Sequence, residues 1–442
     1  MESRTAFIKN SVLWTLLFFV LVIAPLALAA IGHQEEYRGF WIEFGVGLGF
    51  VGLAMMGLQF VLTARYNKIG APFGLDELLN FHGQAGYFAW LFILGHFIIL
   101  FIANTEYIHF LNPAENLPRS LALFAVIIAL TCLIAFTHWR EKIGIVYEWW
   151  RVSHGILALF VVFIGLVHIL QVSFYVTEWW QKALWSALTI GAMGMLIHTR
   201  VWRPYKNLKK PYIVTEVKQE TENIWSLILQ PYGHKGMRFK AGQFAWITFG
   251  DSPFKLQQHP FTMSSPPEVK DKIRFTIKKL GDFTSEIDKI KNGSTAFIEG
   301  PYGNFTLDVS SAEHNIFIAG GIGITPLISM LESINLRNNP LKFTLIYGTP
   351  SIDKTPFYED LKSLSESMNL KVVHVFEEPP ADWKGETGFI TEEIIKKYIP
   401  DDVHSCEYFI CGPPPMMDVA EKALREWGLP VYKVHSERYK IV

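Results

Sequence analysis

Residues 78–103 read LLNFHGQAGYFAWLFILGHFIILFIA, and residues 152–175 read VSHGILALFVVFIGLVHILQVSFY. Each stretch is long enough to cross the roughly 30 Å hydrocarbon core of a bilayer as a helix. Each also contains two histidines fourteen residues apart, namely His82 and His96, and His154 and His168. Fourteen residues bring a helix to within about 40° of a whole number of turns and advance it by about 21 Å. The two rings of each helix are therefore expected on one face, at two depths.

The four histidines predict metal ligation. If the two helices run in the same direction, His82 faces His154 and His96 faces His168. Two facing imidazoles are an axial ligand pair for a six-coordinate heme iron. Hydrogen-bonded structural histidines are the alternative, and they would be the better explanation of a single buried histidine. Because two helices repeat the same spacing, we favour two hemes stacked across the bilayer.

Six apolar stretches in the first half of the chain predict transmembrane helices. They are residues 11–31, 41–64, 78–103, 119–138, 152–175 and 181–200. The first ends in small residues like a signal peptide, but its apolar stretch is long for one, which favours a retained helix. Lys and Arg gather before the first stretch and after the second, fourth and sixth. The positive-inside rule then predicts a multi-pass protein of the cell membrane with both termini in the cytoplasm.

Composition separates a membrane half from a soluble half. The chain is 50% hydrophobic and only 18% charged, and the long apolar stretches end near Trp202. A formal net charge of −1 gives no reason to expect a nucleic-acid partner. From Pro211 onward, short β-type runs such as residues 244–249 (FAWITF) alternate with Gly and Pro. This pattern predicts a small antiparallel barrel.

A strand, a glycine turn and a helix follow in residues 316–331, which read IFIAGGIGITPLISML. Glycines let the backbone approach a ligand, and a helix N-terminus offers free N–H groups to a pyrophosphate. The glycine spacing differs from the usual dinucleotide fingerprint, so this turn alone is weak evidence. Further strands at residues 343–347, 371–376 and 408–410 extend the α/β pattern.

Five motifs of the soluble half carry a family resemblance. His259–Ser265 (HPFTMSS) resembles the flavin-binding motif of the ferredoxin–NADP reductase superfamily, in the form found in NADPH oxidases and ferric reductases. Ile277–Thr284 (IKKLGDFT) and Glu299–Gly303 (EGPYG) are similar to the segments that follow it there. Gly320–Pro326 and Cys411–Pro413 match the two nicotinamide-site motifs, in the right order. The paired histidine spacings are similar to those of the six-helix ferric-reductase membrane domain.

The resemblance implies a multi-domain membrane protein. A six-helix all-α transmembrane heme domain is expected at residues 1–205, an antiparallel β-barrel FAD domain at 206–310, and an α/β NAD(P)H-binding domain at 311–442. A nicotinamide gives up two electrons together as hydride, whereas heme iron accepts one at a time, so a flavin belongs between them. The expected cofactors are FAD and two b-type hemes, with NADPH or NADH as the electron donor.

The family motifs also imply roles for single residues. Thr262 would hydrogen-bond near the flavin ring, Cys411 would border the hydride-transfer position, and Tyr439 is the candidate for an aromatic ring stacked on the flavin. The rest of the FAD site would comprise His259, Pro260, Phe261, Ile277, Lys278, Gly281, Thr284 and Gly300, with Lys278 and Thr284 at the pyrophosphate. The nucleotide site would comprise Gly320, Gly321, Gly323, Thr325, Pro326, Gly412 and Pro413. Ordinary barrel residues and a plain buried cysteine are the alternatives.

The donor and the acceptor remain open choices. Thr349, Ser351 and Lys354 follow the second strand of the nucleotide domain, where a 2′-phosphate is usually bound, which favours NADPH over NADH. Arg38 is a candidate for the basic residue beside which NADPH oxidases reduce oxygen, and an interfacial anchor or heme-propionate partner is its alternative role. The leading hypothesis is a superoxide-forming oxidase. A ferric-chelate reductase and an electron-transfer subunit for a periplasmic or membrane partner are its rivals.

Overall fold

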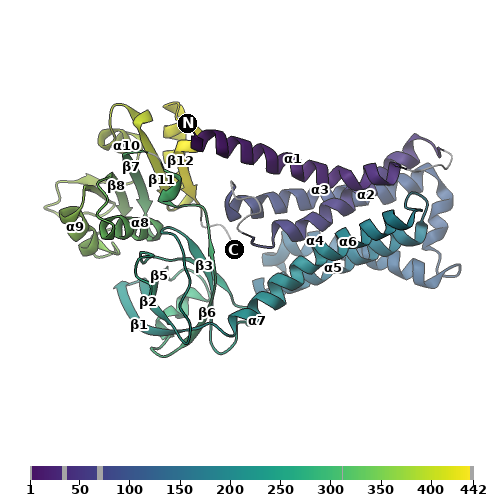
Figure 1. The fold of residues 1–442 in the computed structure, drawn as a ribbon, viewed down its shortest axis with the longest axis horizontal. Coiled ribbons are helices and arrows are strands. Elements are labelled where there is room, and N and C mark those ends of the chain that lie inside the picture. Colours follow the sequence, from purple (N-terminus) through teal and green to yellow (C-terminus); the bar gives the residue numbers. More distant parts are fainter. Residues whose placement is uncertain (1, 32–36, 67–72, 311, 439–442) are drawn as a thin grey trace. The chain divides into compact units, whose positions relative to one another are not determined.

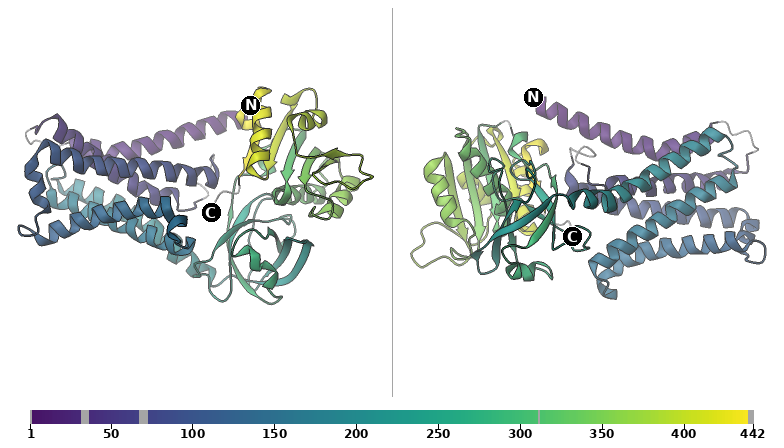
Figure 2. Two further views of the ribbon diagram at one scale, coloured as in Figure 1. Left: turned by 180° about the vertical axis from the view of Figure 1, so that it is seen from behind. Right: turned by 60° about the horizontal axis from the view of Figure 1, so that its bottom comes forward.

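The computed structural model describes residues 2–31, 37–66, 73–310 and 312–438. The chain divides into two compact units. The first is a helical unit formed by Ile8–Phe73 and Glu77–Trp202, and the second consists chiefly of Arg203–Val442. The first unit is shown with the second in Figure 1, and two further views are given in Figure 2.

The helical unit contains long helices that run alongside one another (Figures 1 and 2). They are α1 (Glu2–Ala30), α2 (Phe40–Leu62), α3 (Gly74–Ala103), α4 (Leu117–Ile143), α5 (Tyr147–Val172) and α6 (Trp179–Ile197). Among the described residues, five of these helices, α1 to α5, are long and apolar enough to cross a membrane. The helix predicted at 181–200 exists as α6, but it falls outside this group. Five apolar helices are therefore confirmed, and the six-helix membrane domain stays a prediction.

Local sequence signals set where these helices end. The side chain of Asn116 accepts the N–H of Arg119 at the start of α4, and Gly144 ends this helix in the left-handed conformation with φ 76°. Both are common solutions for the unpaired main-chain groups of a helix terminus. Inside the unit, Phe50 and Leu53 of α2 pack in one apolar core with Val161 and Leu166 of α5.

Within the described part of the second unit, six strands form an antiparallel sheet. They are β1 (Pro211–Thr221), β2 (Ile224–Pro231), β3 (Phe244–Phe249), β4 (His259–Thr262), β5 (Ile273–Lys278) and β6 (Thr295–Tyr302), in the order β4-β3-β6-β1-β2-β5. An antiparallel bridge between Met263 and Phe275 joins the two edges of this sheet. The sheet therefore curls until its edges meet, around an interior that includes Leu227 and Ile247.

The other sheet of this unit is parallel. Its strands are β7 (His314–Gly320), β8 (Lys342–Thr349), β9 (Leu370–Phe376), β10 (Glu386–Thr387), β11 (Cys406–Cys411) and β12 (Val434–Glu437), in the order β10-β9-β8-β7-β11-β12. The apolar residues of α8 (Ile324–Leu336) and α9 (Tyr358–Ser367) share a core with one face. Those of α10 (Glu392–Tyr398) and α11 (Pro414–Glu426) share a core with the other.

The strand order of the parallel sheet locates a binding position. The chain leaves β7 for β8 on one side and returns to β11 on the other, so the order of strands reverses at β7. Open α/β sheets bind ligands outside the carboxyl ends of the strands at such a switch point. The glycine turn after Gly320 and the turn after Cys411 both lie there, because β7 and β11 pair in parallel with Ala319 opposite Cys411.

Candidate functional site

Two pairs of histidines face each other between α3 and α5. The ring centroids of His82 and His154 are 6.2 Å apart, and those of His96 and His168 are 6.4 Å apart. The structure therefore brings together the same residues that the fourteen-residue spacing pairs.

These separations can be tested against a metal. Two imidazoles on opposite sides of one iron, each with a metal–nitrogen bond of about 2.0 Å and a ring centre about 1.2 Å further out, have centroids about 6.4 Å apart. The observed values of 6.2 Å and 6.4 Å match this expectation at both pairs. The four histidines thus fit two six-coordinate heme irons.

The second nitrogen of two of these rings has a hydrogen-bond partner. Nδ1 of His96 lies 3.0 Å from the main-chain oxygen of Gly45, to which it can only donate. Nδ1 of His154 lies 3.4 Å from Oγ1 of Thr137, whose own hydrogen goes to the oxygen of Leu133. Metal-bound histidines use their second nitrogen in this way, because the bond fixes the tautomer and leaves Nε2 for the metal.

Arg38 lies in a cluster of polar and aromatic groups. One guanidinium nitrogen donates to the Tyr175 hydroxyl at 2.6 Å, and Nε lies 3.6 Å from a carboxylate oxygen of Glu43. The Tyr175 hydroxyl donates to the same carboxylate, and the guanidinium lies 3.9 Å from the ring centre of Phe174. The positive charge of Arg38 is therefore offset by Glu43, an arrangement that suits an anchor.

The flavin motif lies on β4, next to β3. The ring of His259 stacks on Phe283 with centroids 4.1 Å apart, and Phe261 lies beside the same ring at 6.3 Å. Thr262 pairs with Phe244 and is buried. Proline at position 260 sits opposite Trp246, in a strand at the edge of the sheet order. This edge is joined to β5 after β4 has ended, through Met263 and Ser264 of the same motif.

The segment after β5 divides into buried and exposed positions. Ile277 belongs to the interior of the curled sheet, so its side chain cannot reach a ligand outside the sheet, whereas Lys278 is exposed. The hydroxyl of Thr284 accepts the N–H groups of Leu280 and Gly281, each at 2.9 Å. Thr284 thereby shapes the turn after Lys278, the segment for which the family resemblance implies phosphate binding.

Glycines of the two nucleotide turns touch backbone to backbone. A Cβ on Gly323 would lie 2.2 Å from the Cys411 carbonyl oxygen, and one on Gly412 would lie 2.9 Å from the Gly320 nitrogen. Gly321 has φ +52°, and a Cβ there would meet nothing within 4 Å. The turn is therefore closed toward β11 and open at Gly321. The Cys411 side chain is fully buried, so in this structure its main chain, rather than its thiol, forms the turn.

Other groups hold the glycine turn in place. The Tyr347 hydroxyl on β8 donates to the main-chain oxygen of Gly321 at 3.0 Å, although the residue is fully buried. Burial raises the pKa of this tyrosine, so it stays a donor. Thr325 donates to the oxygen of Ile322 at 3.0 Å, and Pro326 is buried in the first turn of α8. The N–H of Ile324, the first residue of α8, bonds back to the main-chain oxygen of Gly321, so the glycine turn and the start of the helix form one continuous segment.

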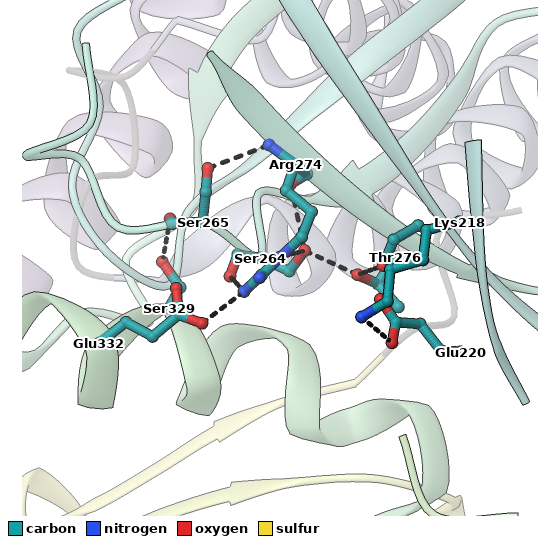
Figure 3. Close-up of polar contacts among 9 residues, drawn as sticks. Lys218, Glu220, Ser264, Ser265, Arg274, Thr276, Ser329 and Glu332 are labelled. Atoms are coloured by element: carbon teal, nitrogen blue, oxygen red, sulfur yellow. Dashed lines mark hydrogen bonds and ion pairs between the residues drawn. The ribbon is translucent and has the colours of Figure 1, made fainter. Parts of the chain in front are cut away.

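Sequence reasoning missed a polar junction between the curled sheet and α8 (Figure 3). Arg274 of β5 donates from Nη2 to the main-chain oxygen of Ser264 and to a Glu332 carboxylate oxygen, each at 2.7 Å. Ser329 of α8 donates to the main-chain oxygen of Ser265 at 2.7 Å. These contacts tie the end of the flavin motif to the helix that begins at the nucleotide turn. Arg274 and Glu332 are 58 residues apart and belong to no motif, so the sequence carries no signal for their pairing.

Two other expectations concern the ends of the site. Tyr439 lies outside the described residues. Of the three residues considered for a 2′-phosphate, Thr349 shares a buried hydrogen bond with Thr355, and Ser351 donates to Asp353 at 2.7 Å. Lys354 is exposed.

Family comparisons match three consecutive parts of the chain. Residues 48–165 match the ferric reductase like transmembrane component, residues 211–306 match an FAD-binding domain, and residues 317–422 match the oxidoreductase NAD-binding domain. The first match contains His82, His96 and His154 and ends three residues before His168. The second contains the flavin motif, and the third contains both glycine turns.

Individual relatives cover mainly the second unit. NADH-cytochrome b5 reductase 1 of Neosartorya fischeri is 30% identical over 169 residues, which is 36% of this chain and 54% of the relative. The flavohemoprotein of Bacillus subtilis is 26% identical over 245 residues, or 54% of this chain and 60% of the relative. The chain thus spans about half to three fifths of these relatives. The crystal structure of the cytochrome b5 reductase domain of Ulva prolifera nitrate reductase has a TM-score of 0.46 at 18% identity, covering 52% of this chain and 98% of that domain.

Proposed function

The chain has the domain architecture of the NADPH oxidase and ferric reductase family, and from this premise we propose that it moves electrons from NADPH across a membrane to oxygen, forming superoxide. The observation that supports this proposal best is the matched separation of two histidine pairs in the same chain as FAD- and NAD-binding domains. A structural role alone would not require two equal pairs about 21 Å apart along the same helices.

In this proposal the second unit binds the nucleotide and the flavin, and the helical unit binds the hemes. The glycine turn at Gly320–Gly323 and the first turn of α8 would bind the nucleotide, and β4 with Thr262 would hold the flavin. The four histidines would ligate two hemes. When bound, FAD accepts a hydride and gives up its electrons singly, and heme iron takes one electron at a time.

Further parts of the proposal follow from sequence alone. Both termini and the second unit would lie in the cytoplasm of a cell-membrane protein, because Lys and Arg gather on that side. The domain boundaries near residues 205 and 310 stay predictions. Thr349 and Ser351 already make internal hydrogen bonds, so the proposed preference for NADPH over NADH is based on the exposed Lys354.

A ferric chelate or a protein partner is the second candidate acceptor. The observation that favours it is the pairing of Arg38 with Glu43, because the positive charge expected to attract oxygen or superoxide is already offset. The same cofactors would then deliver electrons to a ferric chelate or to a protein partner on the side of the membrane opposite the second unit.

The experiment is a reduced-minus-oxidised absorbance spectrum of the purified protein with NADPH and FAD, in argon and in air. A b-type heme signal that accumulates under argon and collapses in air, with superoxide formed, is expected. Heme that stays reduced in air contradicts oxygen as the acceptor and supports the second candidate. Absence of any heme signal contradicts the whole proposal.

The variant that tests the assignment of the heme ligands is His96→Leu. It removes one ligand of the His96–His168 pair, so it should abolish about half of the heme signal and the delivery of electrons to the acceptor. Reduction of the flavin by NADPH should continue, because the flavin and nucleotide sites lie on the other unit. An unchanged heme spectrum in this variant would show that the ligand assignment is wrong.

A further inference from the structure

Three glycines of α2 face one side of α3. Cβ atoms built on Gly45, Gly49 and Gly52 would contact Ile99, His96 and Ile93 respectively. The order along α3 is the reverse of the order along α2, as expected for antiparallel helices whose close faces follow the three-to-four-residue repeat. One member of this face, Gly49, touches a proposed heme ligand.

The contact at Gly49 leaves no room for a side chain. A Cβ at this position would lie 2.8 Å from Nδ1 of His96 and 3.1 Å from both Cε1 and Cγ of the same ring. Real Cβ atoms do not approach other atoms within 3.0 Å, so the imidazole would have to move. His168 faces the same ring at a centroid distance of 6.4 Å, so any such movement changes the separation that fits an iron.

The main chain of the same helix adds a hydrogen bond. The Gly45 carbonyl lies one turn before Gly49 and accepts the Nδ1–H of His96 at 3.0 Å. The bond fixes the tautomer, and the bare face of Gly49 fixes the position of the ring plane. At the other pair, the bond from His154 to Thr137 is longer, 3.4 Å, and Cβ atoms built on Gly83 and Gly86 of α3 would meet no atom within 4 Å.

We propose that Gly49, together with the Gly45 carbonyl, forms a positioning surface that presents Nε2 of His96 to one of the two heme irons. Gly49 is a positioning residue, since it would not touch the iron itself. The inference rests on the proposed function, because His96 acts as a ligand only if the hemes are bound. It adds a requirement on α2, a helix that supplies none of the four histidines.

The test is heme content and the low-spin electron paramagnetic resonance signals of the full-length protein carrying Gly49→Ala. We expect this variant to lose about half of its heme, the same share as His96→Leu, and to keep the other low-spin signal. The double variant G49A/H96L should lose no more than either single variant. The double variant G49A/H82L should retain no heme.

Two other glycines of α2 provide matched controls. Gly47→Ala adds the same methyl group where the nearest atoms, those of Leu26, are 3.9 Å away, so it should keep both hemes. Gly52→Ala adds it 2.7 Å from the Ile93 side chain and 3.2 Å from its nitrogen, which disturbs helix packing without touching His96. Gly52→Ala should therefore keep the low-spin signal that Gly49→Ala loses.

Each outcome has a distinct meaning. If the wild-type protein contains no heme, the proposed function fails, and this inference fails with it. If the wild-type protein contains two hemes and Gly49→Ala retains both signals unchanged, the inference alone is overturned. Loss of both hemes in Gly49→Ala, or loss of the same heme in Gly52→Ala, would also overturn it, because the effect would then be one of helix packing.

Discussion

Replacing Arg274 by methionine removes the cation that joins the flavin-motif segment to α8. The Arg274 and Glu332 side chains are only 20% and 19% exposed, and one guanidinium nitrogen donates two hydrogen bonds of 2.7 Å. Hydrogen bonds to charged groups contribute about 1.5–3 kcal/mol each and are not additive, so we expect the free energy of unfolding of this unit to fall by about 3 kcal/mol. The main-chain bond from Ser264 to the Arg274 oxygen is unaffected by the change.

This loss of stability should depend on pH. Burial raises the pKa of Glu332 above its usual value, and the charge of Arg274 opposes that effect. Without Arg274 the pKa of Glu332 rises further. A carboxyl group with a raised folded-state pKa stabilises the fold below its unfolded pKa, and this contribution is lost as the pH rises through the folded value. The variant should therefore be closer to the wild type at pH 5 than at pH 8.

The assay is thermal release of FAD from the full-length protein, followed by flavin fluorescence. A loss of about 3 kcal/mol corresponds to a fall in Tm of about 6–12 °C for a unit of this size. Arg337→Gln is the matched control, because Arg337 pairs with Glu268 at the same junction but is 49% exposed, and an exposed pair contributes about 1 kcal/mol at most. Equal falls in the two variants, or a fall that does not vary with pH, would refute the reasoning.

Two further predictions concern the nucleotide-binding sheet. Gly323→Ala places a methyl group against the Cys411 carbonyl. The variant should retain its flavin, but NADPH should reduce that flavin at least about tenfold more slowly, as measured by stopped flow. Gly321→Ala, at the open side of the turn, should slow this step less, and equal effects of the two variants would contradict the geometry. Burial lowers the pKa of His374 from 6.5 to about 4, so its neutral ring stabilises the fold fully above pH 6.5, and up to about 3 kcal/mol is lost as the pH falls toward 4. His374→Phe, which can keep the stacking on Phe376, should abolish that part of the acid-side fall in Tm, and an unchanged profile would exclude His374 as its cause.

Apolar residues that repeat along one segment of the sequence predicted these helices and strands well. The stretch at 41–64 corresponds to α2 (Phe40–Leu62), and the run at 244–249 is the whole of β3. A helix or strand of this kind is visible because its apolar residues repeat along one local segment. The sixth helix shows the limit of this signal, since α6 is a helix but does not belong to the five that are long and apolar enough to cross a membrane.

Contacts between distant segments were harder to predict. The histidine pairs could be predicted because both helices have the same fourteen-residue spacing, which indicates which histidine of one helix lies opposite which histidine of the other. Nothing comparable marks Arg274 and Glu332, whose pairing depends on how the curled sheet meets α8. The closeness of Gly49 to His96 likewise depends on the register of two antiparallel helices, although the repeated small residues of α2 are a signal for close packing.

The backbone contact between the two glycine turns limits how this protein can evolve. Gly320, Gly323 and Gly412 each lie where a Cβ would meet another segment within 3 Å, so almost every single-base change in their codons that alters the amino acid is unfavourable. The backbone of this turn is consequently constrained to glycine at these positions, whatever nucleotide the cell supplies. Selection for a different donor would have to act on exposed positions such as Lys354, which lies beyond β8, so that the turn itself is left unchanged.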